Sequence, residues 1–554
     1  MTPTLTGRAP WHPTTLLLVL AVWLATVGNL PLWRAIWRLP ETQGPHALVT
    51  LGTLAAAVLA FTLAFLCLLV WSRWLKPVAL VLLMLAAASS YFMQSYGVVI
   101  DASMIANVAN TNPQEALDLL SWSMLGNLAL GLVLPGLWLW RQPVRPVGAR
   151  RLVWQQLGTM ALALLLAVVL LWVSFQDLAS LMRNHKSLRY MINPFNTVYA
   201  LGRHGVGQAV QAQQVLQPIG EDAHLALPVS NPAAAPLILL VVGETARAAN
   251  FGLGGYARDT TPELRQLQQD GDLVYFSQVS SCGTNTQTSV PCMFSHLGRK
   301  GYVGNDARYE NVLDVMQRAG LAVLWLDNQA GCKGVCDRVP HADTQALKAN
   351  DLCQDGDCLD EALLRALPEQ LARLDPVQTA RGTVVVLHQM GSHGPAYYKR
   401  STPARKAFMP ECTSHALQDC PPEQIVNAYD NSMRETDHFL AQTIHWLQAQ
   451  AKDRPTALVY VSDHGESLGE KGLYLHGMPY ALAPQEQTHV PMLMWLSKGL
   501  QQDRGLQMGC AQAKADKPWS HDNLFHTLLG LAEVQTRVAN TRQDMLAGCV
   551  HHSS

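Results

Sequence analysis

The chain has few charged residues for its length. Only 15% of its 554 residues are Asp, Glu, Lys or Arg, against about 25% in an ordinary soluble protein. It also lacks an excess of either sign, because 40 Lys and Arg are balanced by 41 Asp and Glu. General nucleic-acid binding depends on a basic surface that contacts phosphates. We therefore expect no nucleic-acid partner.

The scarce charge is unevenly distributed. Residues 1–175 hold nine basic and four acidic residues, and the remainder holds 31 basic and 37 acidic ones. A chain of this length also exceeds what one hydrophobic core usually supports. The sequence therefore predicts a membrane-like first third followed by a soluble, slightly acidic domain.

Five apolar stretches in the first third are each close to the roughly 20 residues that cross a bilayer. They are Thr14–Trp33, Ala47–Trp71, Val78–Tyr96, Ser121–Trp140 and Leu152–Phe175. The first has no convincing small-residue cleavage site and four more follow, which favours a membrane anchor over a signal peptide. We predict a transmembrane domain of five helices over residues 1–175.

Basic residues predict the orientation of these helices. Seven lie in the N-terminal tail and the second and fourth loops, and two lie in the first and third loops. The two sets are Arg8, Arg73, Lys76, Arg141, Arg145, Arg150 and Arg151, and Arg34 and Arg38. Since cytoplasmic loops carry the excess of Lys and Arg, the N-terminus is expected in the cytoplasm. An odd number of spans then places the rest of the chain outside the cytoplasm.

Cysteine is almost absent from the first half of the chain, because Cys67 is the only cysteine before residue 280. The other ten follow residue 280, and disulfides persist only in oxidising compartments. Sequential pairing needs only short loops and is the simplest arrangement, but the sequence does not fix connectivity and the last pair follows by elimination alone. A zinc-cysteine cluster is the alternative, although no CxxC pair occurs. The sequential pairs are Cys282/Cys292, Cys332/Cys336, Cys353/Cys358, Cys412/Cys420 and Cys510/Cys549.

Residues 176–236 are expected to bridge the two domains. The first part alternates apolar residues such as Leu178 and Leu181 with basic ones such as Arg183. This amphipathic pattern predicts a helix that lies on the membrane surface or one that packs on the soluble domain. The segment Asn231–Pro236 is typical of a linker.

Residues 237–554 have the pattern of an α/β domain. Uninterrupted apolar runs, typical of strands buried on both faces of a parallel sheet, are separated by helical patterns such as 309–319 and 426–450. The runs are 237–242, 322–326, 383–387, 457–461 and 491–496. Ligands of such sheets bind beyond the carboxyl ends of the strands.

Metal-binding residue types follow two of these runs. Glu244 comes after the first, and Asp463 and His464 come after the fourth. Carboxylates and an imidazole from adjacent strand ends are compatible with zinc or manganese. Thr284 precedes a predicted helix start, where its hydroxyl is either a nucleophile or only an N-cap.

Five long motifs together resemble one family, the lipid A phosphoethanolamine transferases, which include the mobile colistin resistance enzymes of the alkaline phosphatase superfamily. The motifs are VVGETAR (241–247), SCGTNTQTSVPCMFS (281–295), DNQAGCKGVCDRVP (327–340), LHQMGSHGPAYYKR (387–400) and SDHGESLGEKGLYLHG (462–477). The resemblance covers nearly the whole chain. It implies a five-span α-helical transmembrane domain followed by a periplasmic, sulfatase-type α/β domain in the Gram-negative inner membrane.

The resemblance also implies roles for particular residues. Glu244, Thr284, Asp463 and His464 would bind one tightly held zinc ion, with Thr284 as the nucleophile. His393, His476 and Lys333 would receive the phosphate group or a second metal ion, and Asn328 and Glu466 would help to position the substrate.

The implied reaction moves phosphoethanolamine from phosphatidylethanolamine to a phosphate of lipid A, the anchor of lipopolysaccharide. It passes through a phospho-threonine intermediate, and the product confers polymyxin and colistin resistance. We expect the enzyme to act as a monomer.

The third membrane loop holds Asn107, Thr111 and Glu115. In the family this stretch is thought to help hold the lipid substrate, and Glu115 would suit the ethanolamine ammonium. The same stretch, at Asn112–Glu115, also has the pattern of a helix capping box. Both interpretations remain open.

Two classes of protein compete with this interpretation. Other superfamily enzymes are one class, but sulfatases need a modified Cys or Ser that Gly283-Thr284-Asn285 does not supply. Glycerol-phosphate polymerising synthases share the threonine and the five spans, but their extracellular domains seldom carry ten cysteines. The second class is a non-catalytic lipid sensor, which the intact metal, nucleophile and histidine positions disfavour.

Overall fold

The computed structural model describes residues 9–39, 42, 45–71, 74–111, 119–226, 235–305, 307–344, 351–354 and 357–550. The chain forms two compact units. The first consists of Met1–Ile105 and Leu120–Gly205, and the second of Ala106–Leu119 and Val206–Ser554.

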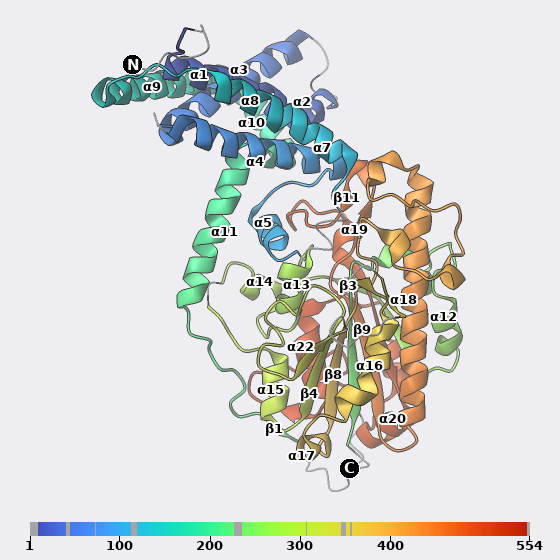
Figure 1. The fold of residues 1–554 in the computed structure, drawn as a ribbon. Helices are drawn as coiled ribbons and strands as arrows, with labels where there is room; N and C mark the ends of the chain where they lie inside the picture. Colours follow the sequence, from blue (N-terminus) through green and yellow to red (C-terminus); the bar gives the residue numbers. More distant parts are fainter. Residues whose placement is uncertain are drawn as a thin grey trace. The chain divides into compact units, whose positions relative to one another are not determined.

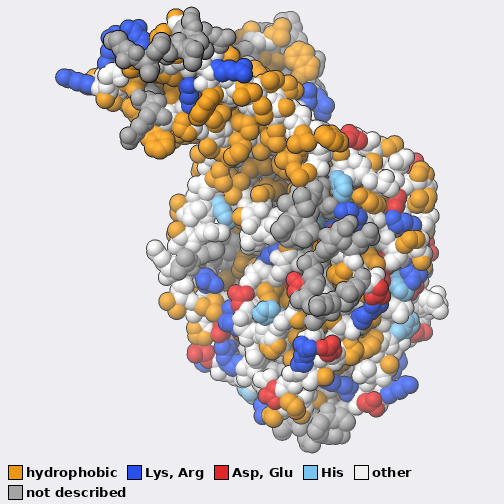
Figure 2. All heavy atoms as spheres, viewed as in Figure 1, with side chains coloured by type: hydrophobic (Ala, Val, Ile, Leu, Met, Phe, Trp, Pro, Cys, Tyr) orange, Lys and Arg blue, Asp and Glu red, His pale blue; other side chains and the backbone are white. Residues whose placement is uncertain are grey.

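The first unit is helical (Figure 1). Five of its helical segments are long and apolar enough to cross a membrane, as the sequence predicts. Their helices are α1 (Pro13–Thr26) with α2 (Leu30–Trp37), α3 (Pro45–Leu69), α4 (Leu75–Tyr96), α7 (Trp122–Leu128) with α8 (Leu134–Arg141), and α9 (Ala149–Val173). Figure 2 shows hydrophobic side chains crowded over this unit, whereas charged side chains are dispersed over the second.

A buried amide pair fixes the bend between α1 and α2. A 3-10 turn at Val27–Asn29 separates the two helices, and Pro31 lies in the first turn of α2, where a missing N–H costs nothing. The Asn29 amide donates to the Asn193 carbonyl at 2.7 Å, and the Asn193 N–H donates back to Asn29 Oδ1 at 2.8 Å. Both polar groups are thereby satisfied inside the apolar unit.

The amphipathic segment after the fifth span packs on the membrane helices. It forms α10 (Phe175–Asn184), and α11 (Phe195–Gln213) follows. Leu178 and Leu181 of α10 are buried in a cluster with Ile36 and Leu54 of the first unit. Of the two alternatives, packing on the soluble domain is disfavoured, because the apolar face of α10 is covered within the helical unit.

An eight-stranded sheet forms the centre of the second unit. In spatial order its strands are β13 (Trp519–Ser520), β3 (Leu273–Ser280), β12 (His489–Leu496), β9 (Thr456–Ser462), β2 (Leu237–Gly243), β8 (Thr383–His388), β4 (Ala322–Asp327) and β5 (His341–Asp343). The five predicted strands are all present, and the α/β class is confirmed. The expectation of a parallel sheet is wrong for β12, which is antiparallel to both neighbours.

Helices cover both faces of this sheet (Figure 1). Leu237, Leu239 and Val241 of β2 face a core that includes α12 (Pro262–Gln268), α16 (Glu361–Leu371) and α18 (Pro422–Gln450). The alternate residues face a second core with α13 (Thr286–Met293), α15 (Val312–Arg318) and α22 (Leu524–Leu531). Burial on both faces explains why the strand sequence is an unbroken apolar run.

Five disulfides lie in the second unit. They join the cysteines in sequential order: Cys282–Cys292, Cys332–Cys336, Cys353–Cys358, Cys412–Cys420 and Cys510–Cys549. Cys67 is a free thiol buried in α3. Disulfides outside the helical unit agree with an oxidising compartment for the second unit.

Candidate active site

Two neighbouring strands bring the acidic candidates together. β2 and β9 are parallel and in register, with Gly243 opposite Ser462, so Glu244 and Asp463 leave the sheet at the same edge. The Asp463 N–H donates to the Gly243 carbonyl at 2.9 Å and extends the ladder by one bond. Asp463 Oδ1 accepts the Thr245 N–H at 3.2 Å, which fixes the direction of the carboxylate.

Glu244, Asp463 and His464 form a fully buried cluster. His464 Nε2 lies 3.4 Å from Glu244 Oε1 and 3.3 Å from Asp463 Oδ2. The other ring nitrogen, Nδ1, lies 2.9 Å from the Gly465 carbonyl, which can only accept a hydrogen bond. Nδ1 therefore carries a proton, and in the neutral ring Nε2 presents its lone pair to the carboxylates.

This cluster fits a divalent cation. One ligand atom from each of the three residues lies within 4.8 Å of the others. Asp463 Oδ2 is buried and has no hydrogen-bond partner among the described residues. Two carboxylates without water are costly to bury unless a positive charge compensates them. Their oxygens and the imidazole nitrogen are ligands that zinc accepts.

The hydroxyl that lies against the cluster belongs to Thr286, not to Thr284. Thr286 Oγ1 is 3.2 and 3.1 Å from the two carboxylate oxygens of Glu244 and 3.3 Å from His464 Nε2. Thr284 instead donates its hydroxyl hydrogen to the carbonyl of Met478 at 2.6 Å. The geometry therefore does not support Thr284 as metal ligand or nucleophile, and it points to a hydroxyl two residues further along the chain.

The start of α13 explains this difference. Asn285 is the N-cap, and its side chain accepts the Thr288 N–H at 3.0 Å. Thr286 is consequently the first residue of the helix, and Thr284 lies one residue before the cap. The N-cap preference of Asn is the sequence signal that could have located Thr286.

His393 and His476 lie beside the same cluster. Ligand atoms of Glu244, His393 and His476 lie within 4.8 Å of one another, and the rings of His464 and His476 are 4.4 Å apart. Burial, with Arg400 and His464 nearby, lowers the pKa of His393 to about 3. Burial also lowers the pKa of His476 well below its ordinary value. Glu244 thus belongs to two groups of residues that could hold a cation, one with Asp463 and His464 and one with His393 and His476.

Asn328 and Lys333 have other partners. The Asn328 amide donates to the Cys358 carbonyl and to Asp360, and its oxygen accepts the Thr344 hydroxyl. These bonds argue against direct substrate contact by Asn328. Lys333 Nζ donates to the Ala330 carbonyl at 2.6 Å, and within the described part of the chain no hydrogen bond or ion pair joins it to the cluster of Glu244, Asp463 and His464.

Glu466 is buried close to the cluster, two residues after His464. Its Oε1 accepts the hydroxyl of Tyr397, and burial raises the pKa of Glu466 well above its ordinary value. Its backbone carbonyl accepts a bond from Arg247 at 3.1 Å. The structure therefore gives Glu466 a fixed position. That Glu466 helps to position the substrate stays a prediction.

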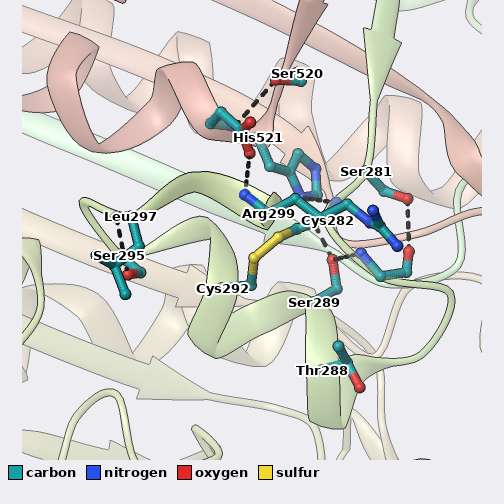
Figure 3. Close-up of a disulfide and its surroundings, with 12 residues drawn as sticks. Ser281, Cys282, Thr288, Ser289, Cys292, Ser295, Leu297, Arg299, Ser520 and His521 are labelled. Atoms are coloured by element: carbon teal, nitrogen blue, oxygen red, sulfur yellow. Dashed lines mark hydrogen bonds between the residues drawn. A yellow bond between two sulfur atoms is a disulfide. The ribbon is translucent and has the colours of Figure 1, made fainter. Parts of the chain in front are cut away.

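His521 is a residue that the sequence analysis missed. Its Nδ1 accepts the Cys282 N–H at 3.1 Å, and its Nε2 lies 2.9 Å from the Ser462 carbonyl. Figure 3 shows the ring beside the Cys282–Cys292 disulfide and Ser289. His521 therefore connects the segment before α13 to the end of β9. No motif around His521 distinguishes it in the sequence.

The predicted lipid-binding residues are only partly described. Thr111 donates its hydroxyl hydrogen to the Asn107 carbonyl at 2.9 Å. The segment Ala106–Leu119 belongs to the second unit although it lies between two spans in sequence. Glu115 and the proposed capping box lie outside the described residues.

Comparisons with known proteins place this site in a family. A family model described as phosphoethanolamine transferase EptA/EptB matches residues 57–209, and a sulfatase model matches residues 236–534. Phosphoethanolamine transferase EptA of Escherichia coli (strain K12) is 40% identical over 538 residues, which cover 96% of each chain. The chain belongs to the phosphoethanolamine transferase family.

Other phosphoethanolamine transferases extend the similarity. Phosphatidylethanolamine transferase Mcr-1 of Escherichia coli is 36% identical, with 95% of this chain and 96% of the relative covered. The integral membrane lipooligosaccharide phosphoethanolamine transferase A of Neisseria meningitidis superposes with a TM-score of 0.92 at 34% identity, covering 97% of this chain and 99% of the other. This transferase is thus a multi-pass protein of the Gram-negative inner membrane, and its second unit lies in the periplasm.

Proposed function

We propose that this phosphoethanolamine transferase moves phosphoethanolamine from phosphatidylethanolamine to a phosphate of lipid A, with Thr286 as the nucleophile. The observation that carries the proposal is the position of the Thr286 hydroxyl, within 3.3 Å of both Glu244 and His464 in a buried cluster. The sulfatase-type domain and the transferase relatives support the reaction class.

We propose zinc as the metal, held by Glu244, Asp463, His464 and the Thr286 oxygen. Zinc bound there would lower the pKa of the threonine hydroxyl and offset the negative charge of the donor phosphate. Asp463 is held by backbone N–H groups and His464 by the Gly465 carbonyl, so neither ligand needs to reorganise. His393 and His476 are placed to hold the phosphate or a second cation.

The transfer has two halves. The Thr286 oxygen forms a bond to the donor phosphorus, the bond to the diacylglycerol oxygen breaks, and the hydroxyl proton passes to that oxygen. A lipid A phosphate oxygen then attacks the phosphorus, the bond to Thr286 breaks, and the proton of the attacking phosphate monoester passes to the Thr286 oxygen, which restores the hydroxyl. His393 and His476 are neutral because burial lowers their pKa values, so they are suited to contacting the phosphate oxygens while the protons pass between the substrate and threonine oxygens.

Both substrates are membrane lipids. We infer that Asn107 and Thr111 contribute to the lipid site, because the segment that carries them groups with the catalytic unit. Each ammonium added to lipid A offsets part of its negative charge and weakens its attraction for cationic polymyxins. We therefore propose that the enzyme confers polymyxin and colistin resistance.

Mass spectrometry of lipid A tests the proposal directly. Gram-negative cells that express the wild-type chain should carry lipid A with one added phosphoethanolamine, and cells without it should not. Unchanged lipid A despite intact protein in the membrane would contradict the proposed acceptor.

Two threonine variants test the nucleophile. Thr286→Val removes the hydroxyl at the cluster and should reduce transfer below detection. Thr284→Val should cost about 1 to 3 kcal/mol of stability, because the buried Met478 carbonyl loses its donor, while transfer stays within about tenfold of wild type. Lipid A spectra and thermal unfolding measure the two effects. The reverse pattern would restore Thr284 as the nucleophile.

A further inference from the structure

The helical unit contains a cavity of 380 Å³ that none of the steps above uses. It lies between the α1–α2 bend, α4 and the span that begins with α7. All of its lining residues belong to the first unit. Its volume falls within the range of about 300–1,000 Å³ that is usual for ligand pockets.

One end of this cavity is polar. It is lined by Arg34, Gln94, Ser90 and Asn127, all from membrane-spanning segments. Arg34 Nη1 donates to Gln94 Oε1 at 2.6 Å, and the Gln94 amide nitrogen donates to Ser90 Oγ at 2.9 Å. These bonds hold the guanidinium at the mouth of the cavity. Arg34 lies three residues before the end of its span, where an arginine side chain can reach the depth of lipid headgroups.

The other end of the cavity is apolar. Trp23, Leu24, Ala86 and Leu130 line it. On α4, Ala86 and Gln94 are eight residues apart, which corresponds to about 12 Å along a helix axis. The cavity therefore changes from polar to apolar over a distance comparable to that between a lipid headgroup and the upper part of its acyl chains.

The membrane topology gives this gradient a direction. Because the N-terminus is cytoplasmic, α2 and α4 end, and α7 begins, at the periplasmic side. The polar end is therefore periplasmic, and the apolar end lies deeper in the bilayer. A phospholipid in the periplasmic leaflet has the same orientation.

We propose that this cavity is a binding site for a glycerophospholipid of the periplasmic leaflet. Arg34 binds the phosphodiester, and the apolar end receives an acyl chain. The bond to Gln94 uses one of the five guanidinium N–H donors, and among the described residues no other partner of Arg34 is found. Guanidinium N–H groups bind phosphate oxygens in pairs, and the single negative charge of a phosphodiester matches the single positive charge.

The first test fills the cavity. Gly126 lines it, and a Cβ at this position meets no atom within 4 Å, so Gly126→Leu places a side chain in the cavity without a backbone clash. Gly158→Leu on α9 is the matched control, since its Cβ is equally free and it does not line the cavity. Native mass spectrometry of the full-length protein counts bound phospholipids per chain.

Wild type and Gly158→Leu should each retain one phospholipid, whereas Gly126→Leu should retain at least tenfold less. Equal retention in all three, or equal loss in both variants, would overturn the proposal. All three proteins also carry Thr286→Val, which removes the proposed nucleophile. The number of bound phospholipids then does not depend on catalysis, so failure of this inference can be distinguished from failure of the proposed function.

The second test removes the charge and covers the case in which Gly126→Leu does not fold. Arg34→Gln should weaken retention about tenfold, and Arg38→Gln, which lies one turn further and outside the cavity, should not. Nanodiscs of phosphatidylethanolamine and of phosphatidylglycerol supply the probes. Retention of both supports recognition of the shared phosphodiester, and retention of phosphatidylethanolamine alone would overturn the phosphate as the recognised group.

Discussion

His521 shows how one neutral side chain holds in place the segment before α13, which leads to Thr286, the proposed nucleophile. Its Nδ1 must be unprotonated to accept the Cys282 N–H, and its Nε2 must carry a hydrogen to donate to the Ser462 carbonyl. Burial lowers the pKa of His521 to about 4, from an ordinary value of 6.5. The folded protein therefore keeps the ring neutral at pH values where the unfolded chain protonates it.

This difference predicts an acid-dependent loss of stability. The neutral ring contributes fully above pH 6.5, and its contribution declines as the pH falls toward 4, because the unfolded chain takes up the proton first. The loss from this residue is on the order of 3 kcal/mol. Thermal unfolding of the full-length protein between pH 7 and pH 4 should show it.

His521→Gln keeps a donor and an acceptor but does not titrate, so it should reduce the pH dependence. His445→Gln replaces an exposed histidine of α18 and should leave the dependence unchanged. An unaltered pH dependence in His521→Gln would contradict the assignment.

The two threonines show the limit of prediction at the scale of single residues. The motif places Thr284 and Thr286 two positions apart, and composition does not tell which hydroxyl reaches a metal. The carboxylates and His464 could be predicted because strand ends on one sheet edge converge. The N-cap preference of Asn285 favours a helix that begins at Thr286, but the sequence does not show that Thr284 is engaged by the Met478 carbonyl, because that contact joins residues 194 positions apart.

At the scale of elements, the first turn of α13 positions Thr286, the proposed nucleophile. Asn285→Ala removes the side-chain acceptor of the Thr288 N–H and should cost about 1 kcal/mol of stability. It should also slow transfer by about tenfold to a hundredfold, because small displacements of a nucleophile are costly. Asn285→Ser should preserve both, as measured by thermal unfolding and lipid A modification.

Ser497→Ala provides the control for this cap. Ser497 is the N-cap of α20 (Lys498–Arg504), where its side chain accepts the Leu500 N–H at 3.3 Å. The same side chain also accepts the Thr456 N–H at 3.0 Å, so its loss should lower stability by at least as much and leave transfer unchanged. Equal loss of transfer in both alanine variants would mean that the cap acts only through global stability.

The sequence predicted the positions of five strands but not the direction of β12 or the presence of β3, for a physical reason. An unbroken apolar run indicates burial on both faces, which holds for β2, β8 and β9, but it contains no information on direction. β12 has the same burial and runs antiparallel. β3 escaped prediction because its last residues, such as Gln278, are polar and exposed, so that the apolar run is short.

At the scale of the whole molecule, cysteine chemistry divides the chain. All five disulfides belong to the periplasmic unit, and Cys67 is the free thiol. Alkylation of the denatured protein without reductant should therefore label one thiol per chain, and alkylation after reduction should label all 11 cysteines. Intact-mass spectrometry counts the labels. More than one label before reduction would contradict the five pairs.

The pairing of β2 with β9 also governs when the enzyme can become active during its synthesis. Thr245 and Asp463, which are joined by a hydrogen bond, are 218 residues apart. At about 5–20 residues per second, a ribosome needs roughly 10–40 s to make the intervening chain. Glu244 is therefore exported without its partners until Asp463 and His464 follow, and no product that terminates before His464 contains the complete set of proposed ligands.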